Sequence, residues 1–343
     1  MTVPQVALGS LFSLDHLARL SDDTGLLEHA KGSVPRREHG YCLDDVARGL
    51  LVLSRVPDPS ARSVSLGECY LAFTAHAQDP SGACRNRLGY DRRWEDQPST
   101  GDWWGRAVWG LGAVVAGSGP QWQREEALDR FSLSARCRSP WPRASAFAVL
   151  GAAEVLSAVP DHDGARRLLA DALISLPRPR PDPAWPWPED RLSYANASMA
   201  EALIAAGSAL GDDLAVTEGV RLLRWLVDLQ THDDHLSLVP VGGWGPGDAR
   251  PGFDQQPIEA AALADACSRA FMVTGEDRWS KAIGDCVRWF LGDNDAHTAM
   301  HDPSTGGGYD GLEPSGANRN QGAESTLAWL LCAQHAQRVV PGL

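Results

Sequence analysis

Apolar residues recur at helical spacing along most of the chain and predict about twelve helices. No parallel βαβ pattern interrupts this periodicity, so we expect an all-α protein. The apolar stretches are centred near residues 12, 50, 70, 110, 128, 150, 168, 201, 221, 264, 284 and 330.

The links between these predicted helices alternate in length. Short links follow the second, fourth, sixth, eighth and tenth helices, and they carry the Gly, Pro and Asp residues that stop and cap helices. If consecutive helices pair as antiparallel hairpins, the links before the even-numbered helices all lie at one end. The pattern predicts an (α/α)6 toroid, a ring of six hairpins with long loops on one face. Those links cover about residues 21–41, 79–101, 176–191, 231–254 and 294–320, with a shorter one at 136–142.

The even-numbered helices also differ from the odd-numbered ones in composition. Two of them, 144–154 and 195–206, are rich in alanine and glycine on every side. Small residues on all faces suit an inner ring that packs on both sides, whereas odd-numbered helices with charged residues on one face suit an outer ring. No Ser/Gly linker or low-complexity tract divides the chain, so we predict one toroid domain over residues 1–343.

Composition limits the classes of partner that we expect this protein to bind. The net charge of −13 argues against a nucleic-acid partner, because such binding depends on clustered Lys and Arg. No apolar run approaches the length of a membrane span, so no membrane partner is expected. The N-terminal residues Met1–Pro4 lack a basic region leading an apolar core, and a cytoplasmic location is the expectation.

Neither a metal nor another cofactor is predicted. The seven cysteines are odd in number and form no CxxC pair, which disfavours disulfides and zinc. Cys42 stands beside Asp44 and Asp45, whose charges should raise the thiol pKa and oppose a nucleophilic role. The run His232–His235 has metal-ligand residue types, but an exposed polar tetrad is more typical of a solvated loop.

Three aspartates near the predicted starts of inner helices are candidate catalytic groups. Asp44 and Asp45 fall in the first turn of one helix and point about 100° apart, so at most one can aim squarely at the toroid axis. The other is free to cap the turn or hold Arg48. Asp102 precedes Arg106 by four residues, so a salt bridge competes with a catalytic role there.

Two glutamates complete the candidate set. Glu259 and Glu324 lie in the first turns of alanine-rich inner helices, where a buried carboxylate must be paired or have a raised pKa. A raised pKa is what a general acid requires, so these two are the expected acids, with Asp44 or Asp45 as base and Asp102 in reserve. For Glu324 the alternative is a capping box with Asn320.

Aromatic and amide residues gather in the same links and helix starts. Flat indoles beside amides and carboxylates make a site for a ring with an apolar face and a rim of hydroxyls, which describes a sugar. The predicted substrate-binding residues are His39, Tyr41, Trp94, Trp103, Trp104, Arg106, Trp187, Asn196, Trp244, Gln255, Gln256, Tyr309, Asn320 and Gln321.

Five segments resemble a bacterial family of α/α-toroid domains that are often described as, or associated with, glycosyltransferases. Its fold is similar to that of the six-hairpin glycosidase superfamily, which the resemblance implies for nearly the whole chain. It also implies a glycosyltransferase encoded nearby as a candidate partner. The segments are HGYCLDDVARGL (39–50), GDWWGRAVWGLG (101–112), PWPEDRLSYANASMAEAL (186–203), FDQQPIEAAALADAC (253–267) and NQGAESTLAWL (320–330).

These features predict a glycoside hydrolase with two carboxylates, and facing helices favour the wide, inverting separation of about 6.5–9.5 Å. A sugar epimerase or isomerase is the first alternative; it needs a general base, usually histidine. A non-catalytic carbohydrate-binding partner of a glycosyltransferase is the second. The histidines considered for the base all fall in long links: His29, His39, His232, His235, His297 and His301.

Overall fold

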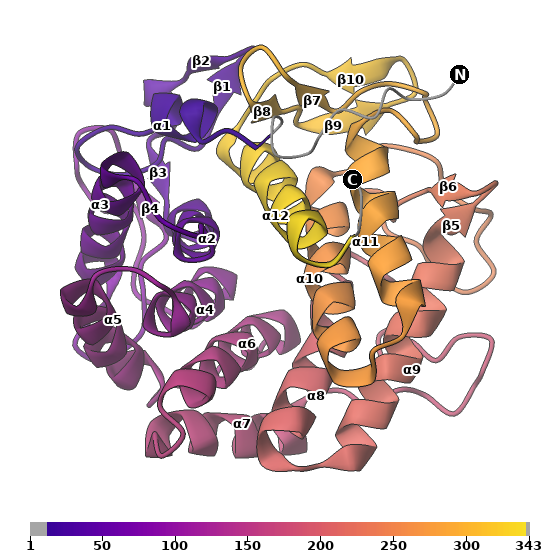
Figure 1. Cartoon of the computed structure of the whole chain (residues 1–343), viewed down its shortest axis with the longest axis horizontal. Helices are drawn as coiled ribbons and strands as arrows, with labels where there is room; N and C mark the ends of the chain where they lie inside the picture. The colour runs from indigo at the N-terminus through magenta and orange to yellow at the C-terminus, as the bar shows by residue number, and fades with distance from the viewer. Residues whose placement is uncertain (1–11, 341–343) are drawn as a thin grey trace.

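The structure, a computed structural model, describes residues 12–340, and the helices in that range form two concentric rings (Figure 1). Each inner helix packs against the next, and the last packs against the first, so the inner ring is closed. The inner helices are α2 (Leu43–Ser54), α4 (Asp102–Ala116), α6 (Pro142–Ala158), α8 (Ala197–Leu210), α10 (Pro257–Thr274) and α12 (Ala323–Val339).

Five outer helices each pack against the inner helix that they follow, and the first outer helix packs against the last inner helix. The (α/α)6 toroid predicted from the link pattern is therefore confirmed. The outer helices are α1 (Asp15–Leu20), α3 (Ala61–Ala77), α5 (Gln121–Ser134), α7 (Asp163–Ser175), α9 (Asp213–Gln230) and α11 (Asp277–Phe290). The first helix, expected near residue 12, begins at Asp15, and residues 1–11 lie outside the described range.

The long links carry short antiparallel strand pairs, and they all lie at the end of the ring where the inner helices begin. The strands do not form a common sheet; each pair only stiffens its own link or joins two links. They are β1 (Ala30–Lys31), β2 (Val34–Pro35), β3 (Tyr41–Cys42), β4 (Arg87–Leu88), β5 (Thr231–His232), β6 (His235–Leu236), β7 (His301–Asp302), β8 (Gly307–Gly308), β9 (Gly311–Glu313) and β10 (Gly316–Asn318), with a 3-10 turn at Arg37–His39.

The inner helices are buried on all sides, as their composition predicts. In α8 every residue from Ala197 to Gly207 is buried, whereas α11 buries only the face that packs on the inner ring. None of the helices within residues 12–340 is both long and apolar enough to cross a membrane.

Glycines bring α4 and α6 into backbone contact. A Cβ placed on Gly112 would lie 2.2 Å from the carbonyl oxygen of Gly151, and one on Gly105 would lie 2.2 Å from the carbonyl oxygen of Ala144. The ring can close this tightly only because these positions have no side chain.

We expect Gly112→Ala to lower the free energy of unfolding by about 2–3 kcal/mol, because the added methyl group must push two helix backbones apart. Chemical denaturation measures this change. Gly242→Ala is the matched control, since no atom lies within 4 Å of its added Cβ, and it should cost less than about 0.5 kcal/mol. Equal stabilities of the two variants would contradict the close-packing account.

Candidate active site

A pocket of about 250 Å³ opens at the end of the ring where the inner helices begin, and we call it the mouth pocket. Its wall is acidic, and most of its side chains come from α2, from α12 and from the links that precede them. The ionisable residues that line it are Glu28, His29, Cys42, Asp44, Asp45, Asp310 and Glu324.

One arginine organises three of these carboxylates. Arg48 lies 2.5 Å from Asp44, 2.9 Å from Asp45 and 2.8 Å from Glu324. Asp44 and Asp45 share α2 with Arg48, whereas Glu324 comes from α12. The guanidinium therefore joins the first and last inner helices, and the three predicted carboxylates meet at one point.

The members of this cluster differ in exposure. The side chains of Arg48 and Asp45 are only 8% and 6% exposed, whereas that of Glu324 is 40% exposed. Burial raises the pKa of Asp45 well above its usual value despite the neighbouring guanidinium. Asp45 is therefore suited to keep a proton, and Glu324 is the member most open to a ligand.

Arg106 takes a different partner from the one its spacing predicts. Its Nε lies 2.8 Å from Asp44 Oδ1 on the neighbouring helix, and its guanidinium lies 3.9 Å from the centre of the Phe147 ring. The expected pair with Asp102, four residues earlier, is not formed, and Asp102 instead accepts a hydrogen bond from the Tyr194 hydroxyl. The prediction of that helical pair was wrong because a partner on another helix was nearer.

Glu28 and His29 were not among the predicted site residues, yet both line the mouth pocket. The Glu28 carbonyl accepts the Ala323 N–H at 2.9 Å, which fixes this link to the start of α12. His29 Nε2 lies 3.6 Å from a Glu28 carboxylate oxygen, and the imidazole is exposed. No local pattern marks these residues, because their position depends on a contact with the far end of the chain.

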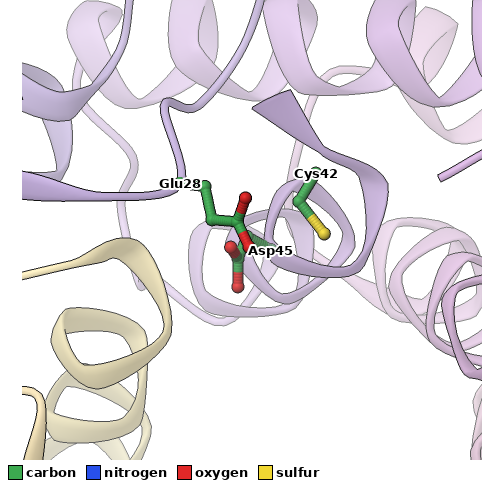
Figure 2. Close-up of side chains that lie close together, drawn as sticks. All are labelled: Glu28, Cys42 and Asp45. Carbon is green, nitrogen blue, oxygen red and sulfur yellow. The ribbon is translucent and has the colours of Figure 1, made fainter. Parts of the chain in front are cut away.

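Glu28 points from its link toward Asp45 on α2, with the Cys42 thiol beside them (Figure 2). Burial, followed by the charges of Asp45 and Asp44, raises the Cys42 pKa well above its usual value. The upward shift of the thiol pKa agrees with the prediction, although burial contributes more to it than the two aspartates do. A thiol in this state is a poor nucleophile.

Two groups in the described residues bring possible metal-ligand atoms within 4.8 Å of one another. They are Glu28, Cys42 and Asp45, and Asp44, Asp45 and Glu324. In the second group Arg48 already supplies the positive charge. In the first, burial raises the pKa of the Cys42 thiol, so a metal would have to displace its proton before binding the thiolate.

Two predicted carboxylates lie away from the mouth pocket. Glu259 is buried and accepts hydrogen bonds from the backbone N–H groups of Ala195 and Asn196 and from the Asn196 side chain. Burial raises its pKa to about 7, although these donors oppose the shift. Glu259 therefore braces the start of α8 against α10, while Asp102 binds Tyr194 at the outer rim.

The capping box with Asn320, considered as the alternative role of Glu324, is absent. The N-cap is Gly322, and Glu324 turns to Arg48 instead of back to the helix start. Asp310 does the capping, since its carboxylate accepts the Gly322 N–H at 2.8 Å and the Ser325 hydroxyl at 2.6 Å. A carboxylate from the preceding link has displaced the local motif.

The predicted tryptophans lie in the core and not on the mouth-pocket wall. Trp104, Trp187 and Trp244 are at most 8% exposed, and Trp187 stacks on Trp225. Trp94 packs against Phe73, and Trp103 donates its indole N–H to the Cys84 carbonyl at 2.8 Å. Long links need their own apolar anchors, and these indoles provide them.

Most of the predicted polar contacts also hold links together. Gln255 accepts the Trp289 indole N–H, the Asn320 side chain accepts the Gly32 N–H, and Gln321 binds Thr305 and Asp302. The Tyr41 hydroxyl donates to Asp22, and Tyr309 is half-buried against the core. Among these candidates only Gln256 lines the mouth pocket, while His39 is exposed with its ring 4.8 Å from that of His29.

The remaining histidines are distant from this chemistry. His301 is buried and stacks on Trp329 at 4.2 Å, and burial lowers its pKa to about 4. His232 and His235 lie in the β5–β6 hairpin, where His235 pairs with Asp295. His29 is the one histidine lining the mouth pocket among the described residues.

Neither a protein-family model nor a curated protein sequence matches the chain. Solved structures do. A sugar epimerase from a ruminal bacterium aligns with a TM-score of 0.73 at 12% identity, over 98% of this chain and 100% of that one. Cellobiose 2-epimerase from Spirochaeta thermophila gives 0.72 at 14% identity, over 98% and 96%. The GH76 α-mannanase BT2949 from Bacteroides thetaiotaomicron gives 0.62 at 12% identity, over 97% and 95%.

The chain has the six-hairpin fold of these enzymes. This confirms the fold that the resemblance of the sequence segments implies. At such low sequence identities the structural similarity shows only the fold. The chemistry must be inferred from the residues that line the mouth pocket.

We expect Arg48→Met to destabilise the toroid by about 3 kcal/mol or more at pH 8, because Asp45 and Glu324 lose the guanidinium that pairs with them while Arg106 still pairs with Asp44. The loss should shrink as the pH falls, because burial raises the pKa of Asp45 and that carboxyl then takes up a proton. Thermal unfolding measured from pH 8 down to about pH 5 tests both effects.

Arg62→Met is the control for this prediction, since the Arg62–Asp15 pair is exposed on both sides and should contribute at most about 1 kcal/mol. A pH-independent loss in Arg48→Met would mean that packing of the side chain, and not its charge, is what matters.

Proposed function

We propose that this toroid is a sugar epimerase or isomerase that works by acid–base catalysis in the mouth pocket. One observation carries the proposal. The mouth pocket brings the exposed imidazole of His29 together with the carboxylate cluster that Arg48 holds. Support also comes from solved structures of the same fold, which include a sugar epimerase, a cellobiose 2-epimerase and a D-mannose isomerase.

His29 is the proposed general base. In a reducing sugar the proton on the carbon next to the carbonyl is acidic enough to be removed, and the C–H electrons move into the carbonyl to give an enediol. Return of a proton to the opposite face of the same carbon gives an epimer, and return to the neighbouring carbon gives the isomer. Glu28, beside His29, stabilises the imidazolium that forms.

The Arg48 cluster is the proposed partner for the sugar oxygen. Negative charge develops on the carbonyl oxygen during proton removal, and buried donors stabilise such charge best. Asp45 can hold a proton for this oxygen, because burial raises its pKa. Arg48 and Arg106 lie directly beneath, where both line a narrow void that continues the pocket along the toroid axis.

The pocket size favours a small substrate. Its volume of about 250 Å³ falls below the roughly 300–1,000 Å³ typical of drug-sized ligand sites. Such a space suits one or two sugar rings better than a long chain. The buried positions of Trp104, Trp187 and Trp244 agree, since none of these three indoles lines the mouth pocket.

Glycoside hydrolysis is the second candidate, and the carboxylate trio favours it. One oxygen from each of Asp44, Asp45 and Glu324 lies within 4.8 Å of the others. This is closer to the spacing of about 5–5.5 Å used by retaining enzymes than to the inverting separation of about 6.5–9.5 Å. The inverting form of the hydrolase prediction is therefore not part of the proposal, and neither is a glycosyltransferase partner.

The decisive test is incubation with reducing aldoses, ketoses and disaccharides in D₂O, followed by NMR. We expect a new sugar to appear with deuterium at the carbon next to the carbonyl. His29→Asn should lower the rate at least about 100-fold, as removal of a general base does.

His39→Asn is the matched control, since His39 lies next to His29 but does not line the pocket. It should stay within a few-fold of the wild-type rate. Release of aryl alcohol from aryl glycosides without deuterium exchange would replace the proposal with hydrolysis. Sugar binding without any turnover would make the toroid a carbohydrate-binding module.

Charge gives an independent prediction about the substrate. Five carboxylates line the mouth pocket, and the guanidiniums of Arg48 and Arg106 beside them offset only part of this negative charge, so a phosphate or carboxylate on the sugar would meet repulsion. We expect a neutral hexose to compete for the site at least about tenfold better than its 6-phosphate or its uronic acid, with a gap that narrows as salt is added. Preference for the phosphorylated sugar would contradict this assignment.

A further inference from the structure

A second polar pocket lies at the other end of the toroid, where the inner helices end, and we call it the base pocket. Its volume is about 310 Å³, and all six inner helices contribute to its wall. Its rim is open to solvent, since Met272 is 69% exposed and Arg338 is exposed. The proposed reaction uses none of its residues.

The base pocket is separated from the mouth pocket. Between them the axis narrows to a void of about 20 Å³ with Leu51, Trp109, Ile258 and Leu331 in its wall. Such a space holds about one water molecule. A sugar in the mouth pocket therefore cannot reach the base pocket along the axis.

Asp265 anchors one side of the base pocket. It lies 2.7 Å from Arg55 and 2.6 Å from His335 Nε2, and these partners outweigh burial and lower its pKa to about 2. Burial lowers the pKa of His335, so the ring is neutral and its Nε2 hydrogen points at Asp265. His335 Nδ1 is then a free acceptor, and it is buried without a partner among the described residues.

Glu201 anchors the other side. One of its oxygens accepts a hydrogen bond from Arg269 Nε at 3.0 Å, and Arg269 also lies 3.4 Å from Glu154. The second oxygen of Glu201 is buried and has no partner in the described part of the chain, although the residue is only 1% exposed. Buried polar atoms in folded proteins almost always have a partner, so two unpartnered atoms on one pocket point to a ligand.

The charges of the wall indicate what kind of ligand fits. Three arginines (Arg55, Arg269 and Arg338) face three carboxylates (Glu154, Glu201 and Asp265), so neither an anion nor a cation gains from the pocket as a whole. His335 Nδ1 needs a hydrogen-bond donor, and the free Glu201 oxygen can accept or donate, because burial raises the pKa of that carboxyl to about 7. Hydroxyl groups supply donors without adding charge, and they can also accept from the arginines.

We propose that the base pocket is a second binding site, separate from the mouth pocket, for a small neutral polyhydroxy compound such as a polyol or a monosaccharide. The ligand places hydroxyl groups against Glu201 and His335 and leaves the ion pairs of the wall intact. This site goes beyond the proposed reaction and does not depend on it.

Methionine methyl NMR tests the site directly, because Met272 lines the base pocket whereas Met199 and Met300 are buried elsewhere. Protein carrying ¹³C-methyl methionine would be titrated with glycerol, mannitol and glucose, and with sulfate and methylammonium as charged probes. We expect the Met272 signal to shift with the neutral polyols and not with either ion. Met272→Leu assigns the signal.

Three variants locate the binding. Ala116→Trp, at the rim, should abolish the shift by filling the pocket, and Ala116→Ser should keep it. His335→Phe retains the ring shape but removes the acceptor, and it should weaken binding about tenfold. Glu324→Gln changes only the mouth pocket and should leave the Met272 shift unchanged, so failure at one site is distinguishable from failure at the other.

The proposal is overturned if Met272 fails to shift with any polyol in the wild-type protein, if the shift survives Ala116→Trp, or if sulfate or methylammonium moves the signal and the polyols do not.

Discussion

The ion cluster around Arg48 is the interaction on which the mouth of the toroid depends. A ring of helices must join its first member to its last, and here a single guanidinium holds Asp44 and Asp45 of α2 together with Glu324 of α12. The same contact that closes the ring concentrates carboxylates in one pocket. Buried clusters of this kind add little stability over apolar packing, but they fix one geometry when every member is paired.

The outline of this fold is largely readable from the sequence. Three sequence features predict it: helical periodicity, the alternation of link lengths and the small residues of the inner helices. Each feature depends on the residues of one segment and not on contacts between distant segments. The position of Asp44, Asp45 and Glu324 in the mouth pocket was also predicted from their place at inner-helix starts, but Asp102 and Glu259, at the starts of other inner helices, lie outside it. Gly112 and Gly151 show the same logic, since they permit the close contact of α4 with α6.

The remainder of the site depends on contacts between distant segments, which local patterns do not record. Trp104 and Trp187 were expected to face a sugar but are buried, because a tryptophan in a link looks the same in sequence whether it anchors the link or lines a pocket. Arg106 pairs with Asp44 on a neighbouring helix and not with Asp102, which lies four residues earlier on its own helix. His29 reaches the mouth pocket only because its link is hydrogen-bonded to the start of α12, about 300 residues later.

The most direct measurement of the central claim is a crystal structure of the protein soaked with a slowly reacting open-chain analogue of a reducing sugar. The account predicts that the analogue lies in the mouth pocket, with its C1–C2 region within hydrogen-bond reach of the His29 imidazole and an oxygen directed toward Asp45 and Arg48. An analogue bound there with its reactive carbons turned away from His29, or a mouth pocket left empty while sugar binds elsewhere, would contradict it.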